Sequence, residues 1–420
     1  MADGARIAAE ARERAYSTPL EDFHVGDPEL FRTDTHWPWF ERLRAEDPVH
    51  YCKASDFGPY WSVTKFDDIV AVDGDPVTFS SSSERGGIAL GDSFEDPAGA
   101  SFISRDSPSH EAQRRVVTPM FASTALAALE PLIRSRAAAI LDELPRGETF
   151  DFVEKVSVEL TGQMLATLLD FPFEERALLP RASDLLLAAP ILGGGFPAGE
   201  PARQAELMAT FTKLVGLWNE RAAAPRAENL ISMLAHDPAT DGGGDPMKYV
   251  GNLVLLIVAG SDTTRHSITG GLLALNENPD QYARLRADPG LIPAMVPEII
   301  RYQSPVAHMR RTATADAVIG GKTIRAGDKV AMWYVSGNRD SSAIADADAF
   351  IIDRDRPRHH VAFGFGVHRC VGQRLAEMQL RVVWEEMLRR FPLIEVVGEP
   401  RRLRSNFVKG YEYLPVRIPG

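Results

Sequence analysis

Residues 363–372 constrain this chain more than any other part of its sequence. They read Phe-Gly-Phe-Gly-Val-His-Arg-Cys-Val-Gly, so glycines stand on both sides of Cys370 and allow the backbone to turn tightly. An apolar pattern with helical spacing follows, from Leu375 to Met387. We therefore expect Cys370 to lie at the point where a tight loop enters a helix.

The surroundings of Cys370 suit a metal-bound thiolate. Loop N–H groups and the N-terminal end of a helix both stabilise a negative sulfur. No second Cys or His stands at zinc-site spacing, and the only other cysteine is Cys52, so a disulfide framework is excluded. A thiolate that is the sole protein ligand suits a haem iron, where it favours O–O cleavage. The alternative is a buried structural cysteine.

Helical periodicity dominates the chain, and strand signals are few. Spacing of the 3.6-residue type occurs at 36–46, 109–143, 152–170, 174–189, 201–222, 249–277, 280–287 and 371–391. Strand signals occur at 49–52, 60–65, 329–332 and 394–397, with a hairpin-like pair around Lys409-Gly410. No linker is evident, so we expect one domain over residues 1–420, mainly α with a small β portion.

Charge and hydropathy exclude several classes of protein. The chain has 46 basic and 58 acidic residues, and this acidic balance argues against a general nucleic-acid binder. The first 17 residues have no apolar core and so resemble neither a signal peptide nor an anchor. The most apolar stretch, Leu253–Ala259, is too short to span a bilayer. A cytoplasmic protein with free thiols is expected.

The segment Ala259-Gly-Ser-Asp-Thr-Thr264 interrupts the apolar helix that begins near Tyr249. A threonine that bonds back to the carbonyl four residues earlier bends a helix, and glycine disfavours its interior. An adjacent acid and alcohol, Asp262 and Thr263, can deliver protons where a general acid is needed. A helix kink with a solvated aspartate is the simpler alternative.

Together these two segments resemble the haem-binding signature and the acid–alcohol pair of the cytochrome P450 superfamily. The resemblance implies a triangular-prism fold with haem b between a long distal helix and the helix after Cys370. It gives Cys370 the role of iron ligand and Asp262 and Thr263 the role of proton relay. It also implies cofactor contacts for Ala259, Phe363 and Gly372.

The same resemblance assigns roles to several charged residues. Glu298 and Arg301 stand three residues apart, as in the superfamily's buried structural ion pair, although most pairs with this spacing are exposed. The usual position of the third partner holds Ala349 here, and Arg354 is the candidate substitute. The residues that match propionate-binding positions, each a surface charge when considered alone, are His110, Arg114, Arg311 and His368.

Longer stretches, at 276–280, 308–312, 332–340 and 406–412, are similar to soluble bacterial alkane and fatty-acid terminal hydroxylases. This similarity implies that O2 is used to hydroxylate the terminal C–H bond of medium-chain alkanes or fatty acids. Electrons would come from NAD(P)H through a ferredoxin reductase and a [2Fe–2S] ferredoxin. The alternatives are a cytochrome P450 acting on terpenoids or other bulky substrates, a peroxide-driven hydroxylase and a haem-thiolate sensor.

Terminal selectivity requires a narrow apolar tunnel that presents only the chain end. The candidate lining residues, for each of which plain core packing is the alternative, are Ile88, Ala89, Leu90, Leu187, Ile191, Leu192, Leu255, Val258, Val306 and Phe407. Gly193–Gly195 could hinge a lid over this tunnel. A basic face for an acidic ferredoxin is expected from Arg369, Arg374 and Arg381.

Overall fold

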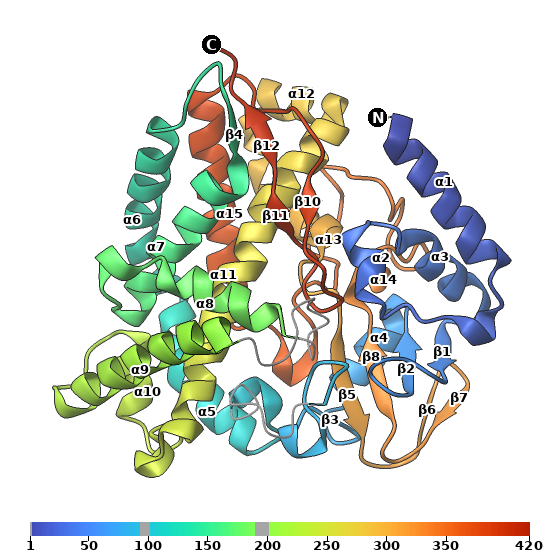
Figure 1. The fold of residues 1–420 in the computed structure, drawn as a ribbon, viewed down its shortest axis with the longest axis horizontal. Coiled ribbons are helices and arrows are strands. Elements are labelled where there is room, and N and C mark those ends of the chain that lie inside the picture. The colour runs from blue at the N-terminus through green and yellow to red at the C-terminus, as the bar shows by residue number, and fades with distance from the viewer. Residues whose placement is uncertain (1, 93–100, 190–200) are drawn as a thin grey trace.

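A computed structural model describes residues 2–92, 101–189 and 201–420. Helices make up most of it (Figure 1). They are α1 (Ala2–Ser17), α2 (Pro28–Arg32), α3 (Trp37–Glu46), α4 (Phe66–Gly74), α5 (Ser109–Val117), α6 (Ser123–Asp142), α7 (Glu159–Leu169), α8 (Leu178–Leu187), α9 (Pro201–Ala223), α10 (Leu230–Ala235), α11 (Pro246–Glu277), α12 (Pro279–Ala287), α13 (Ile292–Gln303), α14 (Tyr334–Gly337) and α15 (Gln373–Arg390). Ile191, Leu192 and Gly193–Gly195 lie outside the described residues.

The strands are short, and the largest sheet lies opposite the main helical layer (Figure 1). Its order is β1 (Val49–Cys52), β2 (Tyr60–Val63), β8 (Lys329–Met332), β5 (Met309–Ala313) and β3 (Phe79–Ser80), and only β2 and β8 are parallel. The other sheets are β4 (Thr149–Asp151) with β12 (Pro415–Arg417) and β9 (Glu395–Val396), β6 (Ala317–Ile319) with β7 (Lys322–Ile324), and β10 (Arg401–Arg402) with β11 (Tyr411–Tyr413).

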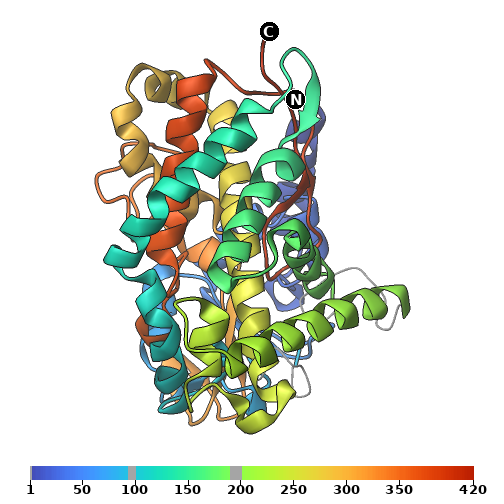
Figure 2. The ribbon, with the colours of Figure 1, turned by 90° about the vertical axis from the view of Figure 1, so that its left-hand side faces the viewer.

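Helix α11 is the long central helix of the molecule (Figure 2). It packs against α7, α8, α13 and α15, and α15 also packs along α6. Leu253, Ile257, Ile268 and Leu272 of α11 are buried, as expected for a helix that other helices surround. The large sheet and the N-terminal helices form separate apolar clusters around Met332 and Trp333. Phe363 and Val371 pack against the helical core, and the N–H of Phe365 binds Asp73 of α4, a helix that packs with the large sheet, so residues 363–372 lie between the two.

The expected class, mainly α with a small β portion, is confirmed. The helical segment expected over 109–143 consists of two helices, because a 3₁₀ turn at Thr118–Phe121 separates α5 from α6. Pro119 lies in this turn, where it has no N–H to donate. The helix expected over 152–170 opens with a π-helical turn, Val153–Val158, before α7.

No single helix in the described ranges has the length and apolar character needed to cross a membrane. Among the described residues, one pair of helical segments, Ser109–Phe121 and Ser123–Asp142, meets the length and composition test together, and the two segments are bent by 50° at their junction.

Candidate haem-thiolate site

Cys370 lies three residues before α15, in the tight loop that the glycines predict. Its backbone N–H donates to the carbonyl of Phe363 at 2.9 Å and closes the loop. Gly364 and Gly366 have φ values of 69° and 65°, a region that side chains rarely adopt. A Cβ on Gly366 would also lie 2.4 Å from the carbonyl oxygen of Asp73, so only glycine fits there.

The Asp73 carboxylate anchors this loop from α4. It accepts hydrogen bonds from the N–H of Phe365 at 3.0 Å and from the Tyr334 hydroxyl at 2.8 Å. Arg311 donates to its other oxygen at 2.8 Å, and both members of this pair are buried. The sequence interpretation missed Asp73. The available signal was that it lies four residues after Ile69 on an otherwise apolar helix face.

A cavity opens between the cysteine loop and α11. Most of the residues that sequence reasoning assigned to the cofactor or the distal pocket line it, and they are His110, Arg114, Leu255, Ala259, Thr263, Val306, Arg311, Phe363, His368, Cys370 and Gly372. These residues come from α5, α11, β5 and the loops before β5 and α15, so the fold gathers segments that are far apart in the sequence.

Burial raises the pKa of the Cys370 thiol. The N–H groups of Gly372 and Gln373 and the nearby Arg114 guanidinium act in the opposite direction, but burial is the largest effect. A thiolate at this position therefore needs a further positive charge beside the sulfur, and a metal ion supplies such a charge.

Cationic and imidazole groups gather at one edge of the cavity. The rings of His110 and His368 lie 4.1 Å apart, and the Nδ1 atom of each is buried without a hydrogen-bond partner in the described structure. Burial lowers the pKa of both histidines, that of His368 to about 2, with neighbouring cations as further causes. Arg114 and Arg311 lie at the same edge. A group with carboxylates would find donors and compensating charge here.

The distal helix carries the acid–alcohol pair on two different faces. The Thr263 hydroxyl lines the cavity and donates to the carbonyl of Ala259 at 2.8 Å, the back-bonding that the sequence predicts. Asp262 is fully buried behind it, beside Arg265 of the same helix at 2.5 Å.

The Asp262 carboxylate is held by α8. Ser183 donates to it, and Arg265 also contacts the half-exposed Asp184 at 2.5 Å. Burial, with the nearby charge of Asp184 as a further cause, raises the pKa of Asp262 to about 6, although Arg265 and the Ser183 hydrogen bond act in the opposite direction. The network is Asp262, Ser183, Arg265 and Asp184, and it connects the back of the distal helix to the protein surface.

A family model described as Cytochrome P450 matches residues 290–410. Linalool 8-monooxygenase of Pseudomonas putida is 37% identical over 411 residues, which cover 94% of this chain and 99% of that one. The chain belongs to the cytochrome P450 family. Methyl-branched lipid omega-hydroxylase of Mycobacterium bovis is 31% identical over 418 residues, 95% of each chain. The structure of CYP153D17 from Sphingomonas sp. PAMC 26605 shares 44% identity at a TM-score of 0.86, covering 96% of this chain and 100% of that one.

This cytochrome P450 is a monooxygenase, and its cofactor is haem b. The described residues fit that group. Cys370 presents to the cavity a sulfur that would ligate the iron, and the unpartnered Nδ1 atoms of His110 and His368 lie at the same edge as Arg114 and Arg311, so these four residues would hold the propionates. The residues expected to bind the propionates therefore lie together at one edge of the cavity, and that role stays a prediction; Arg311 is also engaged by Asp73.

The expected tunnel residues divide into three groups. Leu255 and Val306 line the haem cavity. A neighbouring apolar cluster, which reaches the cavity through Met309, contains Ile88, Ala89, Leu187, Val258 and Phe407. The expectation for Leu90 is wrong, because its side chain is 1% exposed in the N-terminal apolar cluster beside Tyr60 and Trp333. The chain is bent at residues 88–90, and Leu90 packs in a different cluster from Ile88 and Ala89.

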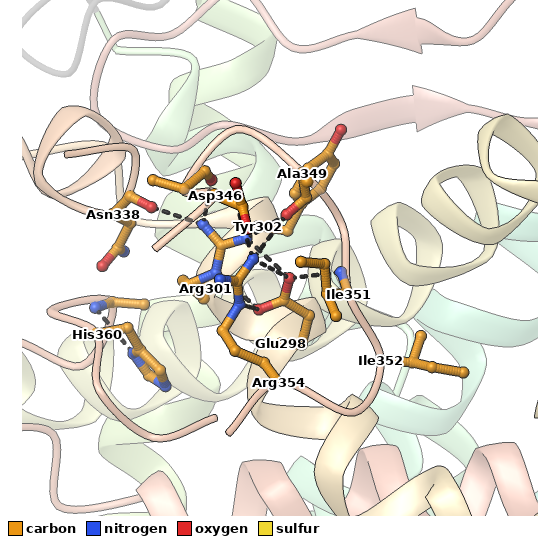
Figure 3. Close-up of polar contacts among 12 residues, drawn as sticks. Glu298, Arg301, Tyr302, Asn338, Asp346, Ala349, Ile351, Ile352, Arg354 and His360 are labelled. Carbon is orange, nitrogen blue, oxygen red and sulfur yellow. Dashed lines mark hydrogen bonds and ion pairs between the residues drawn. The ribbon is translucent and has the colours of Figure 1, made fainter. Parts of the chain in front are cut away.

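The Glu298–Arg301 pair is fully buried and bidentate, with N···O distances of 2.7 and 2.8 Å (Figure 3). Arg354 is its third partner, with Nε 3.0 Å from Glu298. Arg354 thus takes the place of the arginine that is missing at position 349. The same arginines bind backbone carbonyls of Asn338 and Ala349, which ties α13 to the segment before the cysteine loop.

The three arginines expected to bind ferredoxin differ in their surroundings. Arg369 and Arg374 are exposed near Cys370. Arg381 is paired with Glu130 at 2.7 Å and with Glu385 at 3.0 Å, so its charge is already compensated. The basic face is therefore smaller than expected.

Proposed function

We propose that this cytochrome P450 hydroxylates the terminal methyl group of medium-chain alkanes or fatty acids, with alkanes preferred. The observation that carries this is the lining of the cavity. Among the described lining residues, every basic side chain lies at the edge of the cavity that contains Arg114 and Arg311. Helix α11 contributes the apolar residues Leu255, Leu256 and Ala259 to the lining. A fatty-acid carboxylate would find no cation at the distal end, whereas a neutral chain meets apolar walls.

The name of one relative, an omega-hydroxylase of methyl-branched lipids, supports a terminal position. Another relative is an 8-monooxygenase of linalool, which supports terpenoids as the alternative substrate class. The apolar cluster formed by Ile88, Leu187, Val258 and Phe407 would extend the pocket for a long substrate.

Haem bound at Cys370 supplies dioxygen activation, and the chain's own residues supply protons and exclude water. The Thr263 hydroxyl, now bonded to Ala259, can turn its proton toward the cavity. Burial raises the pKa of Asp262 to about 6, so its carboxyl group can hold a proton more readily than an ordinary aspartate and still release it. Arg265 and the half-exposed Asp184 provide its connection to solvent. This route supports an oxygen-dependent over a peroxide-driven or sensory role.

Substrate titration tests the proposal. The optical spin-state change should be followed for octane, decanoic acid and linalool, and products should be analysed with a surrogate ferredoxin system. Tightest binding of octane with 1-octanol as the main product supports the proposal. Preference for linalool with no terminal alcohol from octane supports the terpenoid alternative and would exclude terminal alkane hydroxylation.

We further propose that a ferredoxin, reduced by an NAD(P)H-dependent reductase, delivers electrons at the face of Arg369 and Arg374. Charge reversal there, Arg369→Glu with Arg374→Glu, should slow ferredoxin-driven turnover about tenfold and leave peroxide-driven turnover unchanged. Arg417→Glu, which reverses an exposed arginine paired with Glu395, is the matched control. Equal loss in both kinds of turnover would reject the docking face.

A further inference from the structure

A second cavity lies among α3, the C-terminal half of α11, α13 and the strands β10 and β11. It shares no lining residue with the haem cavity and has a volume of about 300 Å³. That space corresponds to roughly ten water molecules at about 30 Å³ each, so a small organic molecule fits. Its lining is rich in charged groups, unlike the distal part of the haem cavity.

Lys409 is a buried cation of this lining whose ammonium has few hydrogen bonds. It is only 9% exposed, and its ammonium has one long hydrogen bond, to Oε1 of Gln303 at 3.4 Å. The ammonium also lies over the Trp37 ring at 5.3 Å. Its backbone is fully engaged, because the N–H donates to Pro305 and the carbonyl accepts from Gln303. An ammonium has three donors, so two of them face the cavity without a partner in the described structure.

Two further cations of this cavity are incompletely paired. Arg339 stacks on the Tyr302 ring at 3.8 Å and donates to the backbone carbonyls of Asp348 at 2.7 Å and Tyr302 at 3.4 Å. Its Nε has no partner among the described atoms, and the carboxylate of Asp348 is 4.0 Å away. Arg44 donates to the hydroxyl of Ser336 at 2.9 Å but forms no ion pair in the described ranges.

The carboxylates are mostly occupied elsewhere. Asp34 pairs with Arg402 at 3.0 Å, and Glu41 with Arg12 at 2.6 Å. Asp348 lies beside Arg339 at 4.0 Å, and Glu277 lines the cavity without an ion pair in the described ranges. Among the described lining residues this leaves Lys409 and Arg44 without an ion pair, against the single carboxylate of Glu277. Unpaired positive charge therefore exceeds unpaired negative charge, and an anion is the complementary occupant.

We propose that this cavity binds a small organic carboxylate, held by the Lys409 ammonium and the Arg339 guanidinium. The apolar part of the lining favours an organic anion over an inorganic one. Leu273 and Ala274 of α11 and the ring of Trp37 give the cavity apolar surface that a bare phosphate or chloride would leave uncovered. The proposal does not depend on the oxidised substrate.

Isothermal titration calorimetry of the haem-loaded protein with succinate tests this site. One saturable site is expected. Lys409→Met should weaken binding about tenfold or more, because a charge-assisted contact is lost. Lys322→Met, which removes an exposed lysine paired with Asp47, should leave it unchanged. Neutral succinamide should not bind. Absence of saturable succinate binding, binding unchanged by Lys409→Met, or binding of phosphate alone would overturn the proposal.

A measurement on the unaltered protein covers the case in which Lys409→Met fails to fold. Reductive dimethylation followed by mass spectrometry reports the accessibility of each amine. Burial lowers the pKa of Lys409 to about 8, which leaves a reactive neutral fraction near neutral pH. Succinate should slow labelling of Lys409 several-fold and leave Lys322 unaffected. Equal labelling of Lys409 with and without succinate would exclude occupancy of the cavity.

Discussion

Glu298→Gln removes the central charge of the buried cluster that connects α13 to the segment before the cysteine loop. Glu298 is fully buried and accepts from Arg301 at 2.7 and 2.8 Å, from Arg354 at 3.0 Å and from the N–H of Ile351 at 2.8 Å (Figure 3). The amide keeps the volume but leaves two guanidinium groups, 0% and 9% exposed, without their counter-charge. Breaking a buried pair in this way costs about 3–5 kcal/mol.

The corresponding change in Tm follows from the size of the chain. At about 2.1 cal/mol/K per residue, unfolding of a chain of this length has an entropy of roughly 0.9 kcal/mol/K, so Tm should fall by about 3–6 °C. Differential scanning calorimetry of the haem-loaded protein measures it. Glu412→Gln is the control, because Glu412 forms an exposed pair with Arg401 and should change Tm by less than about 1 °C. Equal shifts in the two variants would refute the argument.

Three further outcomes are expected. Cys370→Ser should keep the far-ultraviolet circular dichroism spectrum but abolish turnover and the absorption band of the reduced carbon-monoxide complex that marks a thiolate ligand; an unchanged band would contradict the assignment. Asp73→Asn should lower Tm by about 3 °C and increase the fraction of haem that has lost thiolate ligation, because the loop anchor loses its charge beside Arg311; a normal spectrum would show that the loop is held otherwise. The pKa of Asp262 is about 6 in the folded chain but about 3.9 in the unfolded chain. Between these values the folded state keeps a proton that the unfolded state loses, so the free energy of unfolding should fall by about 3 kcal/mol as the pH rises from about 4 to 6. Asp262→Asn should remove this part of the pH dependence of unfolding by denaturant, and an identical pH profile in the variant would count against the raised pKa.

The sequence predicts local features of the site well and long-range ones poorly. The loop at Cys370 and the back-bonding of Thr263 to Ala259 depend on neighbouring residues, so glycine spacing and helix periodicity suffice to anticipate them. The partners of Asp73 lie 238 and 292 positions away, and nothing in the local pattern of α4 indicates them. For the same reason the Ser183 contact of Asp262, which comes from another helix, could not be anticipated.

The local sequence pattern also does not predict toward which part of the core each side chain of a loop points. Ala89 and Leu90 are adjacent and apolar, yet one packs beside Phe407 and the other in the N-terminal cluster. A hydrophobicity pattern predicts burial for both but does not say in which core. Arg354 shows the opposite case, because it stands only five residues after Ala349, so the local sequence already indicated a candidate for the missing arginine.

Helix α11 explains how one chain holds two chemically different cavities. Its residues Ala259, Thr263 and Ser267 line the haem cavity, and Gly270, Ala274 and Glu277 line the second one. At 1.5 Å per residue the centres of these two groups lie roughly 16 Å apart along the helix. Close packing separates them, because a Cβ on Gly270 would meet Oε1 of Gln303 at 2.3 Å. The absence of a side chain at Gly270 therefore allows α13 to approach α11. Gln303 of α13 in turn contacts the Lys409 ammonium, so this approach also positions a residue that lines the second cavity.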